Sequence, residues 1–405
     1  MDDNAARALR WLDPVLTALP DLTDRHSGRL LRLENDLTEV LTAADHHTTA
    51  SMRLLAVRRR MAERGRTTST TAEHTPATAV AEVLAGFVCG FHDLDLRDAV
   101  GAGHGRMILR HGTDLVRRRW ASRLGAGDLV GIAATERHGG SRLQGITTRA
   151  TPMPGGGWAL DGEKCWVSRL REASAFVVFF KDPADRMSAA VIDADAPGIQ
   201  RRPALPAGLA GWAWGSLSLT GVRIGEADLL GALGDGLAVF REHFAAFRPL
   251  AAATALGTAA GIHAQVTATL TARVTSGILP RLRDTALVTL GRTHAELNAA
   301  LLAATASARL TAAGHPQADT WSRSVKATAV DAANKAVGEL SLLVGASGFQ
   351  TTSALAKARA DLGGLLYADG IHDSLLRSVG RTLTTAASIP AQRSDPVAGE
   401  RVHVA

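Results

Sequence analysis

Two segments in the middle of the chain carry side chains that suit a flat, polar cofactor. The stretch 131–141 begins like a strand and ends in a glycine-rich loop that bears Thr135 and Ser141. Hydroxyls and free backbone N–H groups in such a loop can bind an anionic or heteroaromatic group. In the stretch 160–168, Trp166 and Ser168 stand two residues apart, so a strand there places both side chains on one face. An indole wall beside a hydroxyl indicates a site for a planar ring; a buried tryptophan beside an incidental serine is the alternative.

Three positions in the last third of the sequence combine polar groups with flexible turns. Arg273 follows a long helical stretch, where a guanidinium either complements the helix dipole or binds phosphate. Gly345 opens a Gly-Ala-Ser-Gly loop that lets backbone approach a ligand closely. Asp369 precedes a glycine, where a carboxylate is often a turn former.

The elements that must position these residues change type twice along the chain. Residues 1–128 show apolar residues at helical spacing. Residues 129–232 contain short apolar runs separated by Gly and Pro, which is typical of a β-domain. Residues 233–390 return to long helical stretches, whose Ala and Gly residues permit close helix packing. Residues 391–405, rich in Pro, Ser and charge, are expected to form a loose tail.

Composition excludes several classes of protein. With 405 residues, 46% of them hydrophobic and 21% charged, the chain can build a large core and is not a disordered protein. Cys89 and Cys165 are the only cysteines, so neither a disulfide framework nor a Cys-rich zinc site is expected, and we predict no metal. The first residues carry acids and no long apolar core, and no stretch reads as a membrane span. We therefore predict a soluble cytoplasmic protein.

The net charge of +6 does not by itself indicate a nucleic-acid binder. Of the 45 basic residues, 40 are arginines, and they are scattered among 39 acidic residues. The longest basic runs are Arg58–Arg60 and Arg117–Arg119. Because nucleic-acid binding needs a concentrated basic surface, we expect neither a nucleic acid nor a membrane as partner.

Taken in order, the motifs resemble those of the acyl-CoA dehydrogenase superfamily over roughly residues 80–390. No single motif is decisive, but the ordered set is strong. It comprises His111-Gly112-Thr113, Thr135-Glu136 with Gly140-Ser141, 162–168, Pro197-Gly198-Ile199, 228–231, 234–236, Arg273 with Gly277, 345–349 and Asp369-Gly370. The resemblance implies an α+β, mostly α fold with an N-terminal helical domain (1–128), a middle β-barrel-like domain (129–232) and a C-terminal four-helix bundle (233–390).

The resemblance also implies an FAD site and assigns its residues. Thr135, with backbone around Ile132 and Ala134, would contact the pyrimidine edge of the flavin. Trp166 would pack beside the isoalloxazine, and Ser168 would hydrogen-bond near its N5. Ser141 would lie near the pyrophosphate or the thioester. Arg273 and the Gly345 loop would come from a neighbouring subunit and hold the pyrophosphate and adenine. The resemblance therefore implies a homodimer or homotetramer.

The reaction implied is FAD-dependent α,β-dehydrogenation of an acyl thioester bound to CoA or to a carrier protein. Asp369 falls at the position of the family's catalytic carboxylate. That carboxylate would remove the α-proton while a hydride passes to flavin N5. Arg248 remains as a substrate-binding residue.

The acyl site departs from the family pattern more than the flavin site does. Asp369 replaces Glu, so its carboxylate reaches about 1.5 Å less far. In some members of the superfamily the catalytic base lies on the helix around the position of Phe247. We expect Glu242 and His243 on other faces of that helix than Phe247. Arg169 directly follows the stretch 160–168, and we expect its side chain on a solvated face.

Two alternative functions stay open. A flavin-dependent monooxygenase on the same fold, supplied by a flavin reductase and acting on a natural-product intermediate, needs no carboxylate base. A non-redox or flavin-free relative is the second alternative, suggested by Ser276 and Ile371 in place of family residues. The altered thioester pocket favours a place in secondary metabolism for the dehydrogenase.

Overall fold

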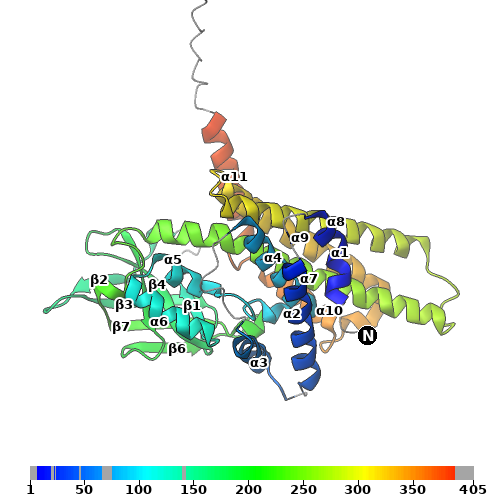
Figure 1. The fold of residues 1–405 in the computed structure, drawn as a ribbon, viewed down its shortest axis with the longest axis horizontal. Helices are drawn as coiled ribbons and strands as arrows, with labels where there is room; N and C mark the ends of the chain where they lie inside the picture. The colour runs from blue at the N-terminus through cyan, green and yellow to red at the C-terminus, as the bar shows by residue number, and fades with distance from the viewer. Residues whose placement is uncertain are drawn as a thin grey trace, which may run out of the picture.

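The computed structural model describes residues 7–19, 22, 24–44, 47–65, 75–138 and 143–387. In this part of the chain, helices come first, then a sheet, then long helices, which confirms the predicted fold class (Figure 1). The sheet occupies one end of an elongated molecule, and the long helices extend toward the other end. The predicted tail, 391–405, lies outside the described residues.

The N-terminal part is helical because its apolar residues recur at helical spacing. In α2, for example, Leu30, Leu33 and Leu37 are buried on one face. The helix α4 begins at Pro76, where Thr75 and Thr78 form a capping box. The elements are α1 Arg7–Ala18, α2 Asp24–Ala43, α3 Ala50–Glu63, α4 Pro76–His92, the 3₁₀ turns Leu94–Leu96 and Gly103–Gly105, α5 Arg106–His111 and α6 Asp114–Gly125.

The middle part forms one sheet with strand order β1-β4-β2-β3-β7-β6, and β5 pairs with β4. Strand β4 is apolar from Ala175 to Phe180 because both of its faces are buried there: Phe176 packs into the core on one side, and Phe179 packs on the other side with Trp120 of α6. The strands are β1 Leu129–Ala133, β2 Arg149–Pro152, β3 Trp158–Val167, β4 Ala173–Lys181, β5 Met187–Asp193, β6 Ile199–Pro203 and β7 Gly215–Ile224. The 3₁₀ turns are Leu143–Gly145, Ala210–Trp212 and Glu226–Asp228.

The C-terminal part is built on α7, a helix of 40 residues that starts beside the sheet and runs through the bundle (Figure 1). It crosses α4 so closely that glycine is required on both helices. A Cβ on Gly257 would lie 2.1 Å from the Phe87 carbonyl oxygen, and one on Gly90 would lie 2.0 Å from that of Thr254. The elements are α7 Gly236–Thr275, α8 Asp284–Ala312, α9 Ala318–Val344, the 3₁₀ helix Gly345–Phe349, α10 Ala354–Gly364 and α11 His372–Ala387.

Among the described residues, no helix is both long and apolar enough to cross a membrane.

Candidate functional site

The loop after β1 lies against the end of β3, and these two segments carry several of the residues predicted to bind the flavin. The backbone N–H of Cys165 donates to the Thr135 carbonyl at 2.9 Å. The Lys164 ammonium, which is fully buried, lies 3.5 Å from the Ala134 carbonyl. The segment with Ala134 and Thr135 thereby lies against the part of β3 that precedes Trp166.

Glu136 fixes this loop in place. Its carboxylate accepts hydrogen bonds from the Lys164 ammonium at 2.7 Å and from the backbone and hydroxyls of Thr147 and Thr148 at 2.6–3.0 Å. Burial alone would raise the pKa of Glu136, but these hydrogen bonds and the ammonium lower it to about 2. The residue after Thr135 is therefore a structural anchor, and Thr135 itself stays half-buried.

Trp166 and Ser168 do not share a face as a regular strand would require, so that prediction is wrong. The register of β3 against β7 shifts between Lys164 and Val167, and Trp166 has a φ of 54°. Trp166 is 58% exposed, whereas Ser168, just past the strand, is 3% exposed. The bulge turns the indole outward, with its edge toward Trp214 at 6.3 Å between ring centroids.

This exposed indole fits a planar cofactor. A large aromatic side chain that is more than half exposed beside an ordered, anchored loop offers a wall that a flat ring would cover. Ile132 is half-buried in β1, and Ser168, directly after β3, is buried. Ser141 lies outside the described residues, so its predicted role stays a prediction.

Asp369, the predicted base, is held in a buried ion pair. Its Oδ2 lies 3.0 Å from Nη1 of Arg97, and its side chain is 8% exposed. Arg97 also pairs with Asp98 at 3.1 Å and lies over the Trp212 ring at 3.6 Å. The guanidinium therefore neutralises the carboxylate from within the protein.

Lys326 clamps the loop that carries Asp369. Its buried ammonium donates to the Leu365 carbonyl at 2.6 Å and to the Gly370 carbonyl at 2.7 Å. Burial lowers the pKa of Lys326 to about 8. Asp369 itself has a φ of 55°, a left-handed conformation that this clamp helps to hold.

Arg169 is buried, so its predicted place on a solvated face is wrong. Its guanidinium bonds Asp98 at 2.7 Å, the Gly211 carbonyl at 2.9 Å and the Asp95 carbonyl at 3.1 Å. A sequence pattern could not find this, because the partner acid stands 71 residues earlier.

Phe247 lies in a cluster of aromatic rings that sequence reasoning missed. His243 stacks on it with 5.1 Å between centroids, and His104 lies at 4.8 Å. The prediction that His243 faces away from Phe247 is wrong, because residues four apart lie on one side of a helix. That spacing is the signal that could have found the pair.

Arg248, the predicted substrate-binding residue, is buried and partly paired within the protein. Its Nη1 donates to Asp319 at 3.1 Å and lies 3.4 Å from the Ser322 hydroxyl. Its Nε is buried without a hydrogen-bond partner. Burial lowers the pKa of Arg248 to about 10, so the group stays charged.

Arg273 and Gly345 come together at the far end of α7. The Arg273 guanidinium donates to the Val344 carbonyl at 3.3 Å, directly before Gly345, whose φ is 73°. Arg273 stands 26 residues beyond Phe247 on one helix, which is about 39 Å at 1.5 Å per residue. The same chain therefore does not bring this pair to Trp166.

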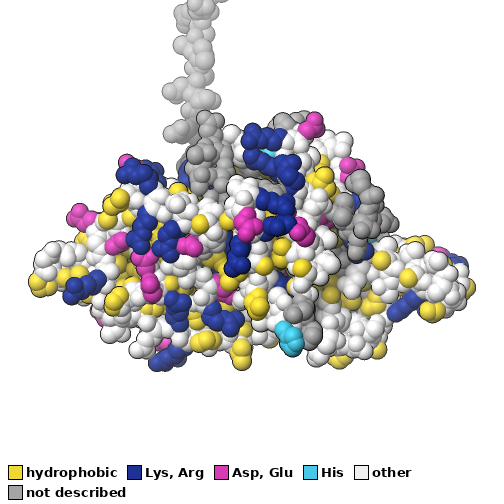
Figure 2. Space-filling view, turned by 60° about the horizontal axis from the view of Figure 1, so that its bottom comes forward, with side chains coloured by type: hydrophobic (Ala, Val, Ile, Leu, Met, Phe, Trp, Pro, Cys, Tyr) yellow, Lys and Arg dark blue, Asp and Glu magenta, His cyan; other side chains and the backbone are white. Residues whose placement is uncertain are grey.

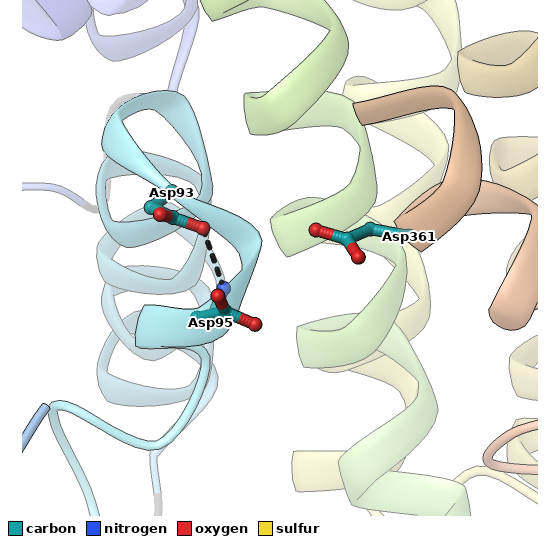
Figure 3. Close-up of side chains that lie close together, drawn as sticks. All are labelled: Asp93, Asp95 and Asp361. Atoms are coloured by element: carbon teal, nitrogen blue, oxygen red, sulfur yellow. Dashed lines mark hydrogen bonds between the residues drawn. The ribbon is translucent and has the colours of Figure 1, made fainter. Parts of the chain in front are cut away.

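A cluster of three carboxylates has the spacing of a metal site, but a lysine occupies it. Figure 3 shows Asp93 and Asp95, from the turn after α4, facing Asp361 of α10. The Lys357 ammonium lies 2.7, 3.0 and 2.6 Å from Asp93, Asp95 and Asp361 respectively. The cation in this cluster is a side chain, and the contacts tie α10 to the N-terminal helices.

Arg58, the first residue of the run Arg58–Arg60, is not part of a cationic surface. Arg58 is buried and donates to the carbonyls of Asp98, Gly101, Gly127 and Asp128 at 2.6–3.2 Å. On the face shown in Figure 2, basic side chains have acidic and apolar side chains among them.

Comparisons with known proteins agree with this geometry. The profile of the acyl-CoA dehydrogenase middle domain matches residues 131–222, and that of the acyl-CoA dehydrogenase C-terminal domain matches residues 234–384. The mouse mitochondrial very long-chain specific acyl-CoA dehydrogenase is 28% identical over 186 residues, which cover 42% of this chain and 28% of that protein. The probable acyl-CoA dehydrogenase FadE10 of Mycobacterium tuberculosis is 34% identical over 136 residues, which cover 32% of this chain and 21% of that protein. The matches thus span less than a third of these relatives.

Solved structures with the same fold cover nearly the whole chain. A glutaryl-CoA dehydrogenase from Mycobacterium smegmatis in complex with FADH2 has a TM-score of 0.77 at 21% identity, covering 92% of this chain and 97% of its own. PigA with FAD and proline has a TM-score of 0.76 at 17% identity, covering 90% and 99%. The prolyl acyl carrier protein oxidase AnaB has a TM-score of 0.73 at 17% identity, covering 89% and 99%. Together with the two matching domain profiles, these findings confirm the family inferred from the motifs: the chain belongs to the acyl-CoA dehydrogenase superfamily of flavoproteins.

Proposed function

We propose that the protein is an FAD-dependent oxidoreductase that introduces an α,β double bond into an acyl thioester. The observation that carries this proposal is the exposed Trp166 indole, which stands beside the anchored Thr135 loop in a chain of this family. When bound, FAD supplies the two-electron oxidant that accepts the hydride of the β-carbon.

The residues of the middle domain bind and orient the flavin in this proposal. Trp166 packs beside the ring system, and Thr135 with backbone of Ile132 and Ala134 contacts its pyrimidine edge. Ser168, which is buried directly after β3, donates near N5. Ser141 is assigned to the pyrophosphate or the thioester by its motif alone.

A second subunit completes the flavin site. The Arg273 guanidinium contacts the backbone directly before the Gly345 loop. Arg273 lies about 39 Å along α7 from Phe247. A neighbouring copy therefore supplies these residues to the pyrophosphate and adenine, which requires a homodimer or a homotetramer.

The acyl site is polar. Arg248 has a buried Nε without a hydrogen-bond partner, and Arg97 and Asp369 form a buried ion pair. We propose a short or functionalised acyl group on CoA or on a carrier protein, in a cytoplasmic pathway of secondary metabolism. The solved neighbour AnaB, a prolyl acyl carrier protein oxidase, supports the carrier protein.

The test is anaerobic reduction of the FAD-loaded protein. Candidate thioesters, including butyryl-, glutaryl- and prolyl-CoA and the same acyl groups on a carrier protein, are mixed with it while the visible flavin absorbance is followed. Bleaching by one of them supports the proposal. A protein that binds FAD yet is bleached by none would refute the dehydrogenase, and a protein that binds no FAD would favour the flavin-free alternative.

One observation favours a monooxygenase as the second candidate. Asp369 is neutralised by Arg97, and a reaction of reduced flavin with O₂ needs no carboxylate base. Oxygen consumption that depends on a flavin reductase, NADH and an added natural-product intermediate would distinguish this activity from dehydrogenation.

A further inference from the structure

A turn of the middle part, residues 168–172, brings three exposed arginines into one region of the surface. Arg171 lies in this turn, shortly after the end of β3. Arg201 and Arg202 lie on β6, which is the edge strand of the sheet. The strand β6 lies against the turn, because Nη1 of Arg201 donates to the Leu170 carbonyl at 3.3 Å.

The positive charge of these arginines is not neutralised by carboxylates of the described chain. The Arg201 guanidinium donates to backbone carbonyls, that of Ala194 among them, and these carry no net charge. Neither Arg171 nor Arg202 pairs with an acidic side chain among the described residues. Asp195 is an exposed acid beside Ala194, so three guanidinium groups face one carboxylate there. The region therefore keeps an excess of positive charge.

The helix α3 adds apolar side chains to this region. The Ser51 hydroxyl donates to the Glu172 carboxylate, which places the start of α3 beside the turn. Met52 and Leu55, three residues apart on one side of α3, are 55% and 39% exposed. Exposed methionine together with arginine is typical of surfaces that bind another protein. We call this surface the basic face; it consists of Arg171, Arg201, Arg202, Met52 and Leu55.

The basic face adjoins the exposed Trp166 indole. The backbone N–H of Ala204, directly after β6, donates to the Trp214 carbonyl at 2.9 Å, and the rings of Trp214 and Trp166 are 6.3 Å apart. Leu205, the next residue, is 98% exposed. Arg171 follows Trp166 by five residues, which is at most about 18 Å of extended chain. A group held on a flexible arm can therefore reach the indole from a partner seated on the basic face.

We propose that the basic face docks an acidic carrier protein, whose phosphopantetheine arm brings the acyl thioester to the Trp166 wall. This inference rests on the proposed dehydrogenation and selects the carrier. The arginines would attract the acidic domain, and Met52 and Leu55 would be covered by its apolar side chains. A CoA thioester has no such domain and would leave Met52 and Leu55 exposed.

Docking can be measured without turnover. The FAD-loaded protein is titrated against a fluorescently labelled holo acyl carrier protein of bacterial fatty-acid synthesis, with anisotropy as the signal. We expect saturable binding that weakens about tenfold between about 50 and about 300 mM salt. Arg171→Glu/Arg202→Glu should weaken binding at low salt by about tenfold or more.

Arg149→Glu/Arg223→Glu is the matched control for this titration. It changes the net charge by the same amount at exposed positions, but these residues pair with the start of β3 or with Asp161, whereas the basic face follows the end of that strand. The control should bind the carrier protein as the native protein does. Absence of binding by the native protein, or equal binding by the two double variants, would overturn the docking face.

The use of the face is tested by flavin reduction with an acyl group that bleaches the native holoprotein, supplied on the carrier protein and on CoA. Arg171→Glu/Arg202→Glu should raise the half-saturating concentration of the carrier-bound substrate about tenfold, with the maximal rate and the reaction of the CoA thioester unchanged. An equal effect on both thioesters would show that the arginines bind the phosphate of the arm, and would refute docking of the carrier domain.

Failure of this inference and failure of the proposed function give different results. A native holoprotein that CoA thioesters bleach but that binds no carrier protein would refute the docking face and leave the function intact. A native holoprotein that no thioester bleaches would refute the function, and the titration with carrier protein would then decide the docking face.

Discussion

At the scale of single residues, the site is governed by buried charges that compensate one another. Arg97 holds two carboxylates, Asp98 and Asp369, and lies over an indole, while Arg169 shares Asp98. A charge in a low-dielectric interior is tolerated only when it is paired, so each member fixes the position of the others. The predicted catalytic Asp369 is therefore part of the structural framework of the site.

Arg97→Met tests this compensation. The substitution leaves two buried carboxylates short of a partner and should lower the free energy of unfolding by about 3–5 kcal/mol. Arg110→Met is the matched control, because Arg110 makes an exposed pair with Glu242, and its loss should cost less than about 1 kcal/mol. Urea denaturation of both variants measures the difference, and equal small losses would show that Arg97 is dispensable.

Glu136 makes the stability of the fold depend on pH in the acidic range. Its pKa in the folded protein, about 2, lies below its usual value of 4.5, so the ionised carboxylate contributes stability that is complete above pH 4.5. That contribution is lost as the pH falls through about 2. The difference in unfolding free energy between the native protein and Glu136→Gln should therefore be constant near neutral pH and shrink over this acid range. A difference that does not change with pH would contradict the assigned hydrogen bonds.

At the scale of elements, the order and type of segments could be predicted from the sequence, but local irregularities could not. Apolar spacing and the Gly and Pro residues between short runs indicated the helices and the sheet, because these patterns follow from burial of one face. The outward position of Trp166 depends on a bulge against β7, and the burial of Arg169 depends on a distant acid. Such features arise from tertiary contacts that no local pattern encodes.

The crossing of α4 and α7 is a close contact between two helices. Gly257→Ala should lower the free energy of unfolding by about 1–3 kcal/mol, because the added methyl group meets the Phe87 carbonyl and the helices must separate. Gly291→Ala, on α8 with no atom near the new methyl group, is the control and should stabilise the protein by about 0.5–1 kcal/mol. Thermal unfolding of both variants distinguishes the effects, and two stabilising substitutions would mean that the crossing is loose.

At the scale of the whole molecule, the distance between the two halves of the proposed flavin site predicts that each site is shared between subunits. Trp166 stands beside the sheet, whereas Arg273 stands at the far end of α7 (Figure 1). In a two-fold dimer each site then takes its indole from one chain and its guanidinium from the other. Trp166→Ala and Arg273→Ala should each weaken FAD binding when expressed alone.

Co-expression of the two variants provides the decisive measurement. A mixed dimer holds one site in which both substitutions meet and one site in which both residues are native, so tight FAD binding should reappear in part of the population. Titration of the purified mixture with FAD, read as quenching of flavin fluorescence, measures this recovery. If both residues served a site within one chain, every site in the mixture would carry one substitution and no tight binding would return. Recovery thus requires the guanidinium and the indole of one flavin site to come from different chains.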